Sequence, residues 1–125
     1  MKQLEEKVFK KALVIPKGAY KNCLKLEYIS LLKVRVISAE AFSGCIMLEA
    51  LQLSENLEVI EENAFRNCSA LKLLEIPNGV WHIGDMAFQG CDNLKKIIIP
   101  KKWEHDMERI FGGWREYYRA DITYI

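Results

Sequence analysis

The sequence has little of what several functional classes require. Lysine and arginine number 18 against 17 aspartates and glutamates, so the basic excess of a typical nucleic-acid-binding protein is missing. No apolar run approaches the ~20 residues of a membrane-spanning helix. The opening residues MKQLEE contain no apolar signal-peptide core. We therefore expect neither nucleic-acid binding nor a membrane span, and a chain that begins natively at Met1 is expected to be cytoplasmic.

Histidine is also scarce, and the 2 that are present form no catalytic or metal-binding pattern. Catalysis needs convergent polar groups, such as a nucleophile with a base. His82 lies beside an apolar column and is expected at a turn or a rim. His105 lies in the run WEHD, whose spacing matches no common metal motif. We therefore expect no enzyme activity, no cofactor and no metal site.

What the sequence does contain is a repeat centred on phenylalanine. Phe42, Phe65 and Phe88 lie 23 residues apart (65−42 and 88−65), within the recurring blocks AFSGC, AFRNC and AFQGC. An earlier unit centred on Tyr20 precedes the first block at an offset of 22 (42−20). This period is typical of short supersecondary units stacked in one direction.

Each unit also carries a segment spaced L-x-x-L-x-L, with Ile allowed at the later positions. Its last three residues alternate as in a half-buried strand, so stacking of the segments predicts a parallel sheet along one face. Gly or Asn follows every aromatic turn, in the column Asn22, Gly44, Asn67 and Gly90. These residues tolerate the left-handed conformation that ends a helix, so we expect a short helical turn on the other face.

The cysteines fall in one column, one to a unit: Cys23, Cys45, Cys68 and Cys91. We interpret them as small buried hydrophobic residues at tight corners. Disulfides between neighbouring units, about 5 Å apart, are a weaker alternative. A metal site is weaker still, because zinc ligands come in close pairs that converge tetrahedrally, whereas these cysteines form a line.

Residues 101–125 keep the repeat register despite their irregular appearance. Adding 23 to the preceding unit assigns core columns to Trp103, Phe111, Trp114, Tyr117 and Ile122, on Val80, Phe88, Cys91, Leu94 and Ile99. A terminal repeat that closes the core against water is usually atypical, so we predict a capping repeat here. Tyr118 and Tyr124 stay free to be exposed. An aromatic hot spot for a partner is the alternative for this tail.

The chain is predicted to be one domain, residues 1–125. Residues 12–100 hold four clear repeats of 22–23 residues, and 101–125 form the divergent fifth repeat or C-terminal cap. Residues 1–11 are either a remnant of a preceding repeat or an N-terminal cap: Leu4 and Phe9 match their columns, but Lys7 falls on Ile29. The register leaves open whether the chain is a piece of a longer array.

The unit I-x-x-x-A-F-x-[GN]-C-x-x-L-x-x-[LI]-x-[LI]-P resembles the BspA-like leucine-rich repeat, a bacterial surface-antigen type also found in some protozoa. The match runs from about Ile15 to Pro100. The resemblance implies an α/β fold: a right-handed leucine-rich-repeat solenoid with a short parallel sheet on one face and short helical turns on the other. It also implies a non-enzymatic protein associated with adhesion and with binding of host or matrix proteins. The resemblance transfers no specific binding residue.

Strand positions that point away from the core are the candidate protein-binding site. One outward column reads Tyr28, Ala50, Leu73, Lys96, Arg119, and the next reads Ser30, Gln52, Glu75, Ile98, Asp121. An extended sheet of mixed character suits protein recognition better than small-molecule capture. The candidate contact residues are Tyr28, Ser30, Gln52, Leu73, Glu75, Lys96 and Ile98.

The repeat and its resemblance favour a non-catalytic protein-binding or adhesion module. If the chain is a fragment of a longer protein, we expect that protein at a bacterial cell surface or secreted. An intracellular scaffold or regulatory module is one alternative, and a structural spacer without its own ligand is another. The open parallel edges of the array also allow end-to-end self-association.

Overall fold

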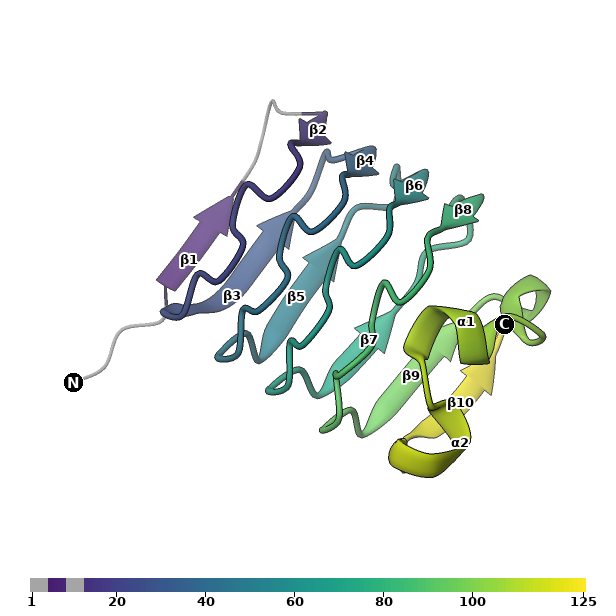
Figure 1. The fold of residues 1–125 in the computed structure, drawn as a ribbon. Coiled ribbons are helices and arrows are strands. Elements are labelled where there is room, and N and C mark those ends of the chain that lie inside the picture. The colour runs from purple at the N-terminus through teal and green to yellow at the C-terminus, as the bar shows by residue number, and fades with distance from the viewer. Residues whose placement is uncertain (1–4, 9–12) are drawn as a thin grey trace.

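The computed structural model describes residues 5–8 and 13–125, with backbone alone at 5–8, 116 and 117. The chain winds into about five stacked turns, so that equivalent segments of successive units lie side by side (Figure 1). Each turn contributes a longer strand to one face, which we call the strand face. It then contributes a two-residue strand at the opposite corner. The predicted parallel-sheet solenoid is confirmed.

The longer strands form two parallel sheets rather than the single sheet predicted. The first contains β1 (Glu5–Val8), β3 (Leu26–Leu31) and β5 (Ala50–Leu53). The second contains β7 (Leu73–Glu75), β9 (Lys96–Ile99) and β10 (Asp121–Tyr124). The predicted columns hold within each sheet, since Tyr28 lies opposite Ala50 and Leu73 lies opposite Lys96.

The face is interrupted between β5 and β7, which belong to different sheets. These neighbouring strands end in turns of different chemistry. After β5, the buried Ser54 accepts a hydrogen bond on Oγ from the backbone N–H of Asn56, at 2.9 Å. After β7, the chain instead turns through Pro77, Asn78 and Gly79. We call this interruption the seam.

A third parallel sheet lies at the other edge of each coil, where the sequence showed only an apolar column. It contains β2 (Val14–Ile15), β4 (Val36–Ile37), β6 (Val59–Ile60) and β8 (His82–Ile83), in that order. The second residue of every strand is buried in the core, and the first is half-buried or exposed. Successive residues of a strand point to opposite faces, which explains the pairing of one core residue with one outer residue.

The Ala-Phe blocks form consecutive tight turns, not the short helical turns predicted. Backbone hydrogen bonds there span three residues, as from Ala41 N–H to the Ser38 carbonyl. Each of these turns contains two residues with positive φ, and each of them interrupts helical geometry. The first is Glu40, Asn63 or Met86, and the second is the Gly or Asn that follows the phenylalanine. The described residues form helices only after Pro100: η1 (Lys101–Trp103), α1 (Met107–Phe111) and α2 (Trp114–Tyr117).

The centre of the stack is a ladder of aromatic rings, one for each turn. Tyr20, Phe42, Phe65, Phe88 and Phe111 follow one another with centroid distances of 5.4, 5.1, 5.2 and 5.8 Å. The four phenylalanines have no exposed surface. Burial of rings of this size dominates core energetics, so the 23-residue period is the period of the core itself.

The alternation of Asn and Gly after each aromatic turn has a packing cause. A Cβ on Gly44 would overlap the Asn22 side-chain oxygen, and one on Gly90 would overlap that of Asn67. The amide of one coil thus occupies the space that a side chain of the next coil would need. Both glycines also have positive φ, so they satisfy two constraints at once.

The C-terminal residues cap the core, but with a shifted register. Trp103 and Phe111 are buried as predicted. In β10 the register is shifted by two residues from the 23-residue period, so that Ile122 pairs with Ile97 rather than Ile99. Consequently Asp121, and not Arg119, extends the column of Lys96.

Tyr118 corrects a second expectation for the tail, since it is buried rather than exposed. Its hydroxyl donates a 2.7 Å hydrogen bond to the Phe88 carbonyl. In the preceding coil, the Cys91 thiol donates to the Phe65 carbonyl in the same way. Tyr118 therefore ends the cysteine column, a place predicted for Trp114, which is half-buried against Phe111. Tyr124 is exposed as expected, and the Tyr117 side chain lies outside the described residues.

At the other end of the stack, β1 pairs with β3. Lys7 lies opposite Ile29, as the register predicts. Leu4 and Phe9 lie outside the described residues. None of the helices in the described part of the chain combines the length and the apolar character needed to cross a bilayer.

Candidate protein-binding face

The seven candidate residues divide into two groups, one on each side of the seam. The first group lies on β3 and β5: Tyr28, Ser30 and Gln52. The second group lies on β7 and β9: Leu73, Glu75, Lys96 and Ile98. Direct cross-strand pairing joins Ser30 to Gln52, Leu73 to Lys96 and Glu75 to Ile98, whereas Tyr28 lies opposite Ala50.

The first group is held together by the Gln52 side chain. Its amide oxygen accepts hydrogen bonds from the Ser30 hydroxyl at 3.3 Å and from the Tyr28 hydroxyl at 3.5 Å. Ser30 is only 4% exposed, so the expectation that it is accessible is wrong. β3 lies between β1 and β5, and the short Ser30 side chain is held by the amide of the exposed Gln52. Gln52, which is exposed, and Tyr28, which is half-buried, therefore form the accessible part of this group.

The second group alternates apolar and charged side chains across β7 and β9. Leu73 is 49% exposed and lies opposite the exposed Lys96. Glu75 is exposed and lies opposite the half-buried Ile98. Such a surface offers aliphatic contact together with hydrogen-bonding and ionic groups within one strand spacing.

The seam opens into a hollow of about 540 Å³ that connects the two groups. Gln52 lines it from one side, and Leu73 and Glu75 line it from the other. Its walls also include Leu51 and Leu53, which are half-buried because no paired strand covers them on this side. The hollow therefore has apolar walls near polar side chains, which suits an aliphatic side chain of a partner accompanied by a hydrogen-bond donor or a cation.

The cysteines contribute no reactive group to this face. All four are free thiols, and Cys45, Cys68 and Cys91 are buried. Each of these three donates to a backbone carbonyl of the preceding coil, at 3.2–3.3 Å. Burial raises the pKa of Cys45 to about 11, and raises the pKa values of Cys68 and Cys91 further. These thiols therefore stay protonated at neutral pH and act as structural hydrogen-bond donors.

Metal ligands do not gather in the part of the chain that the structure describes. No three side chains of His, Cys, Asp and Glu lie close enough there to hold an ion. The His105 imidazole contacts the Glu104 carboxylate at 3.5 Å and is otherwise turned to solvent. His82 is exposed, as expected for a rim residue.

Comparison with known proteins assigns the repeat. The family model described as "BspA type Leucine rich repeat region (6 copies)" matches residues 13–116. That range contains the aromatic ladder, the cysteine column and most of the strands. The chain belongs to the BspA-type leucine-rich repeat family. No curated protein sequence matches it significantly.

Solved structures of leucine-rich repeat proteins share this fold. The pneumococcal vaccine antigen PcpA is 27% identical with a TM-score of 0.72, over 75% of this chain and 24% of that one. A leucine-rich cell surface protein of Faecalibacterium prausnitzii is 32% identical with a TM-score of 0.62, over 64% of this chain and 21% of that one. The T. pallidum leucine-rich repeat protein, at 24% identity and a TM-score of 0.59, shows the fold alone. The BspA-type chain thus spans about a quarter of the first two proteins.

The exposed Trp81 of this BspA-type chain was not predicted from the sequence. Trp81 is 64% exposed and lies outside the strand face, immediately before β8. A signal for it was present: the same column holds the charged residues Arg35 and Glu58 in the preceding coils. The exposed Leu13 occupies this column in the first described coil, but Arg35 and Glu58 mark it as a column outside the core, where a tryptophan is expected to be exposed.

Proposed function

We propose that this chain is a non-catalytic protein-binding module of a bacterial cell-surface or secreted protein. The partner lies on the strand face and inserts a side chain into the seam. Leucine-rich repeat folds serve in general as binding modules rather than as enzymes. A vaccine antigen and a cell surface protein among the similar structures support the location.

The hollow at the seam is the observation that carries the proposal. It is the place where side chains from both groups of candidate residues face a common space, namely Gln52, Leu73 and Glu75. Half-buried Leu51 and Leu53 add apolar surface that the folded chain itself leaves partly uncovered. Covering such surface is a main source of binding free energy at protein interfaces.

A protein suits this face better than a small molecule. Small-molecule sites enclose most of the ligand surface in a concave pocket with a few convergent polar groups. Here the polar groups are spread over two sheets, from Tyr28 on β3 to Lys96 on β9. A partner that spans several strands contacts both groups at once.

The test is binding to purified matrix proteins, measured by biolayer interferometry with the chain immobilised. The double variant Leu73→Ser/Glu75→Lys changes the seam without touching a buried residue. We expect it to weaken binding at least tenfold. The matched control Leu24→Ser/Ile46→Ser alters two exposed apolar residues at the coil corners and should leave affinity unchanged. Unchanged affinity in the seam variant, or equal losses in both, contradicts the proposal.

The other functions considered from the sequence make different predictions. A spacer binds none of the matrix proteins. An intracellular scaffold keeps all four thiols free in its native compartment, and cross-linked cysteines in protein isolated from that compartment exclude it. End-to-end self-association pairs β10 of one copy with β1 of the next, since each is the outer strand of its sheet. Sedimentation velocity over a range of concentrations tests that pairing.

A further inference from the structure

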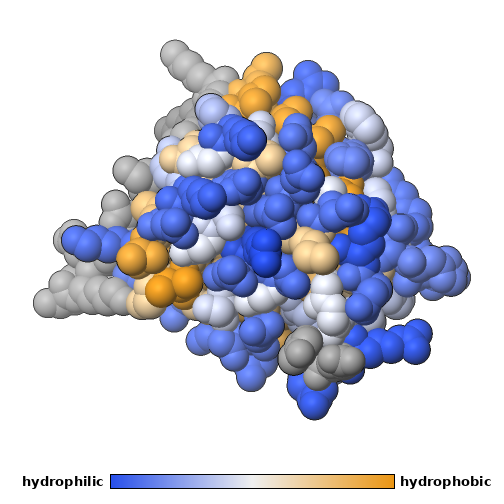
Figure 2. All heavy atoms as spheres, viewed as in Figure 1, coloured by the Kyte–Doolittle hydropathy of each residue, from blue (hydrophilic) through white to orange (hydrophobic). Residues whose placement is uncertain are grey.

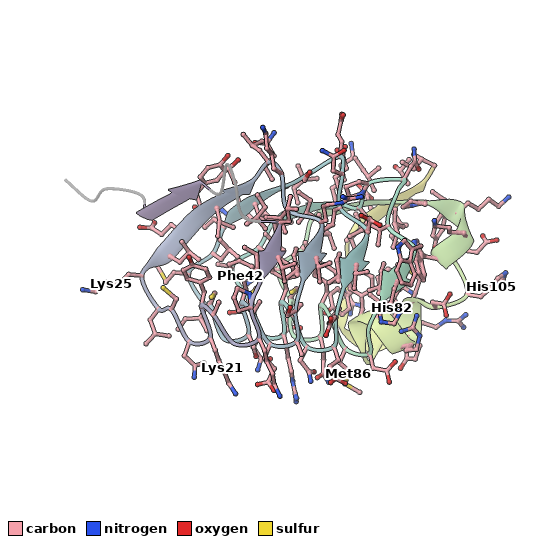
Figure 3. All side chains as sticks on the ribbon, turned by 90° about the horizontal axis from the view of Figure 1, so that it is seen from above. Lys21, Lys25, Phe42, His82, Met86 and His105 are labelled. Carbon is pink, nitrogen blue, oxygen red and sulfur yellow. The ribbon has the colours of Figure 1, made fainter. Side chains whose placement is uncertain are left out.

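A second hollow lies on the outer side of the β2-β4-β6-β8 sheet, away from the strand face. Its volume is about 650 Å³. We call it the Trp81 groove and define it by Val36, Val59, Glu61, Glu62, Trp81 and Arg109, which line it. Figure 2 shows an apolar stripe, in orange, along the ends of β2, β4 and β6. Figure 3 labels His82 of β8, which lines the groove beside Trp81.

The floor of the groove is apolar. Val36 and Val59 are the outward residues of β4 and β6, and they pair directly across the sheet. Both are half-buried. Trp81 follows in the next coil with 64% of its surface exposed. Its ring lies near that of His82, at a centroid distance of 6.1 Å, and no described cation lies over it.

The walls of the groove carry an excess of negative charge. The Arg109 guanidinium is held within the protein, by the Asp85 carboxylate at 3.2 Å and by the Ile83 carbonyl at 2.6 Å. Glu61 and Glu62 have no ion-pair partner among the described residues. A cation entering the groove therefore meets two carboxylates whose charges are not already neutralised.

We propose that the Trp81 groove receives a lysine or arginine side chain from an apolar-flanked segment of a partner protein. The cationic head group lies over the Trp81 ring and within reach of Glu61 and Glu62. The aliphatic stem of a basic side chain covers apolar surface while its head stays polar, which matches the valine floor. An acidic or neutral segment gains only the apolar part of this contact.

The groove is a contact separate from the seam, and it does not depend on the proposed function of the strand face. Its residues lie on the strands of the third sheet, directly beside those strands, or on α1 of the C-terminal cap. Trp81 and the two glutamates do not line the hollow at the seam. Variants in one site therefore leave the other site intact, so a failure of the groove proposal can be told apart from a failure of the proposed function.

The experiment uses three acetylated and amidated peptides that differ only at two positions: GIKIKG, GIEIEG and GIQIQG. Binding to the full chain is followed by isothermal titration calorimetry at low salt. We expect GIKIKG to bind more tightly than the other two, and raised salt to weaken its binding. Trp81→Ala should weaken it fivefold to thirtyfold, roughly the range of a desolvated cation–π contact. Glu61→Gln/Glu62→Gln should weaken it as well, whereas Leu73→Ser at the seam should not.

Several results would overturn the proposal. One is equal binding of the three peptides, which would indicate general apolar adhesion. Another is an unchanged affinity in Trp81→Ala, whose far-ultraviolet circular dichroism is expected to match the parent because the residue is exposed. No detectable GIKIKG binding at millimolar concentration also overturns it. Concentration-dependent self-association that Trp81→Ala abolishes would assign the groove to a second copy of this chain instead.

Discussion

Truncation of the central rung of the aromatic ladder, Phe65→Ala, should destabilise the fold severely. Phe65 has no exposed surface, and its ring stacks on Phe42 at 5.1 Å and on Phe88 at 5.2 Å. A fully buried phenylalanine replaced by alanine costs about 3–5 kcal/mol, including the cavity left behind. Aromatic pairs add about 0.5–1.5 kcal/mol each beyond their burial, and here two pairs are lost. We therefore expect a cost in the upper half of that range.

The assay is urea unfolding followed by circular dichroism, with the free energy of unfolding taken from the linear extrapolation. Leu73→Ala is the matched control, since it truncates an apolar side chain in the same coil that is 49% exposed. We expect that control to lose less than about 1 kcal/mol. Equal losses in the two variants would refute the inside and outside assignment of the columns. A change in the slope of the unfolding free energy against urea concentration in Phe65→Ala would show instead that the two halves of the stack no longer unfold together.

Three further predictions concern the joints between coils. Gly90→Ala should lower the free energy of unfolding by about 2 kcal/mol or more in the same assay, because it places a side chain at a positive φ and against the Asn67 amide. Adding Asn67→Gly to that variant should recover part of the loss. An unchanged free energy of unfolding in Gly90→Ala would contradict the close approach of the two coils. Tyr118→Phe should cost about 1 kcal/mol through the hydrogen bond lost to the Phe88 carbonyl, and an unchanged midpoint would count against the capping role. Burial raises the pKa of Cys45 from 9.0 to about 11, so the folded state favours the protonated thiol. The contribution of this thiol to the free energy of unfolding should therefore be complete below pH 9 and decrease as the pH rises towards 11. In Cys45→Ala that fall should be shallower by at most about 1.4 kcal/mol for each pH unit, and an identical slope would contradict the buried, protonated thiol.

The repeat predicted most of the fold, because each core column recurs in several coils. The spacing of Phe42, Phe65 and Phe88 predicted the stacking order. Three of the four cysteines are buried as predicted, whereas Cys23 in the first coil is half-buried. Columns of this kind depend only on the period. They therefore survive in Phe111, where the surrounding sequence has diverged.

Features that occur once were not predictable in the same way. The seam lies between the coil whose strand ends in the Ser54 turn and the coil whose strand ends in the Pro77 turn, and it occurs once in the stack, so a column shared by all coils gives no sign of it. The burial of Tyr118 depends on the irregular spacing of the cap, where its hydroxyl reaches the Phe88 carbonyl 27 residues after Cys91 (118−91) rather than 23. Adding a fixed period cannot reveal such an insertion.

The candidate residues were predicted as continuous columns and lie in two groups, and their role in binding stays a prediction. Outward pointing was correct for Gln52, Leu73, Glu75 and Lys96, which are exposed. Ser30 was wrong because exposure depends on the size of neighbouring side chains as well as on strand alternation. The hollow that joins the groups arises from missing strand pairing, which leaves no mark in the hydrophobic pattern.

Carbene footprinting of the chain, alone and with a matrix protein that it binds, tests most directly where the partner lies. The label modifies exposed side chains, and mass spectrometry reports the loss of labelling at each residue. We predict that protection concentrates at Gln52, Leu73 and Glu75 around the seam. Protection confined to the coil corners or to the Trp81 groove, with labelling at the seam unchanged, would contradict a partner on the strand face.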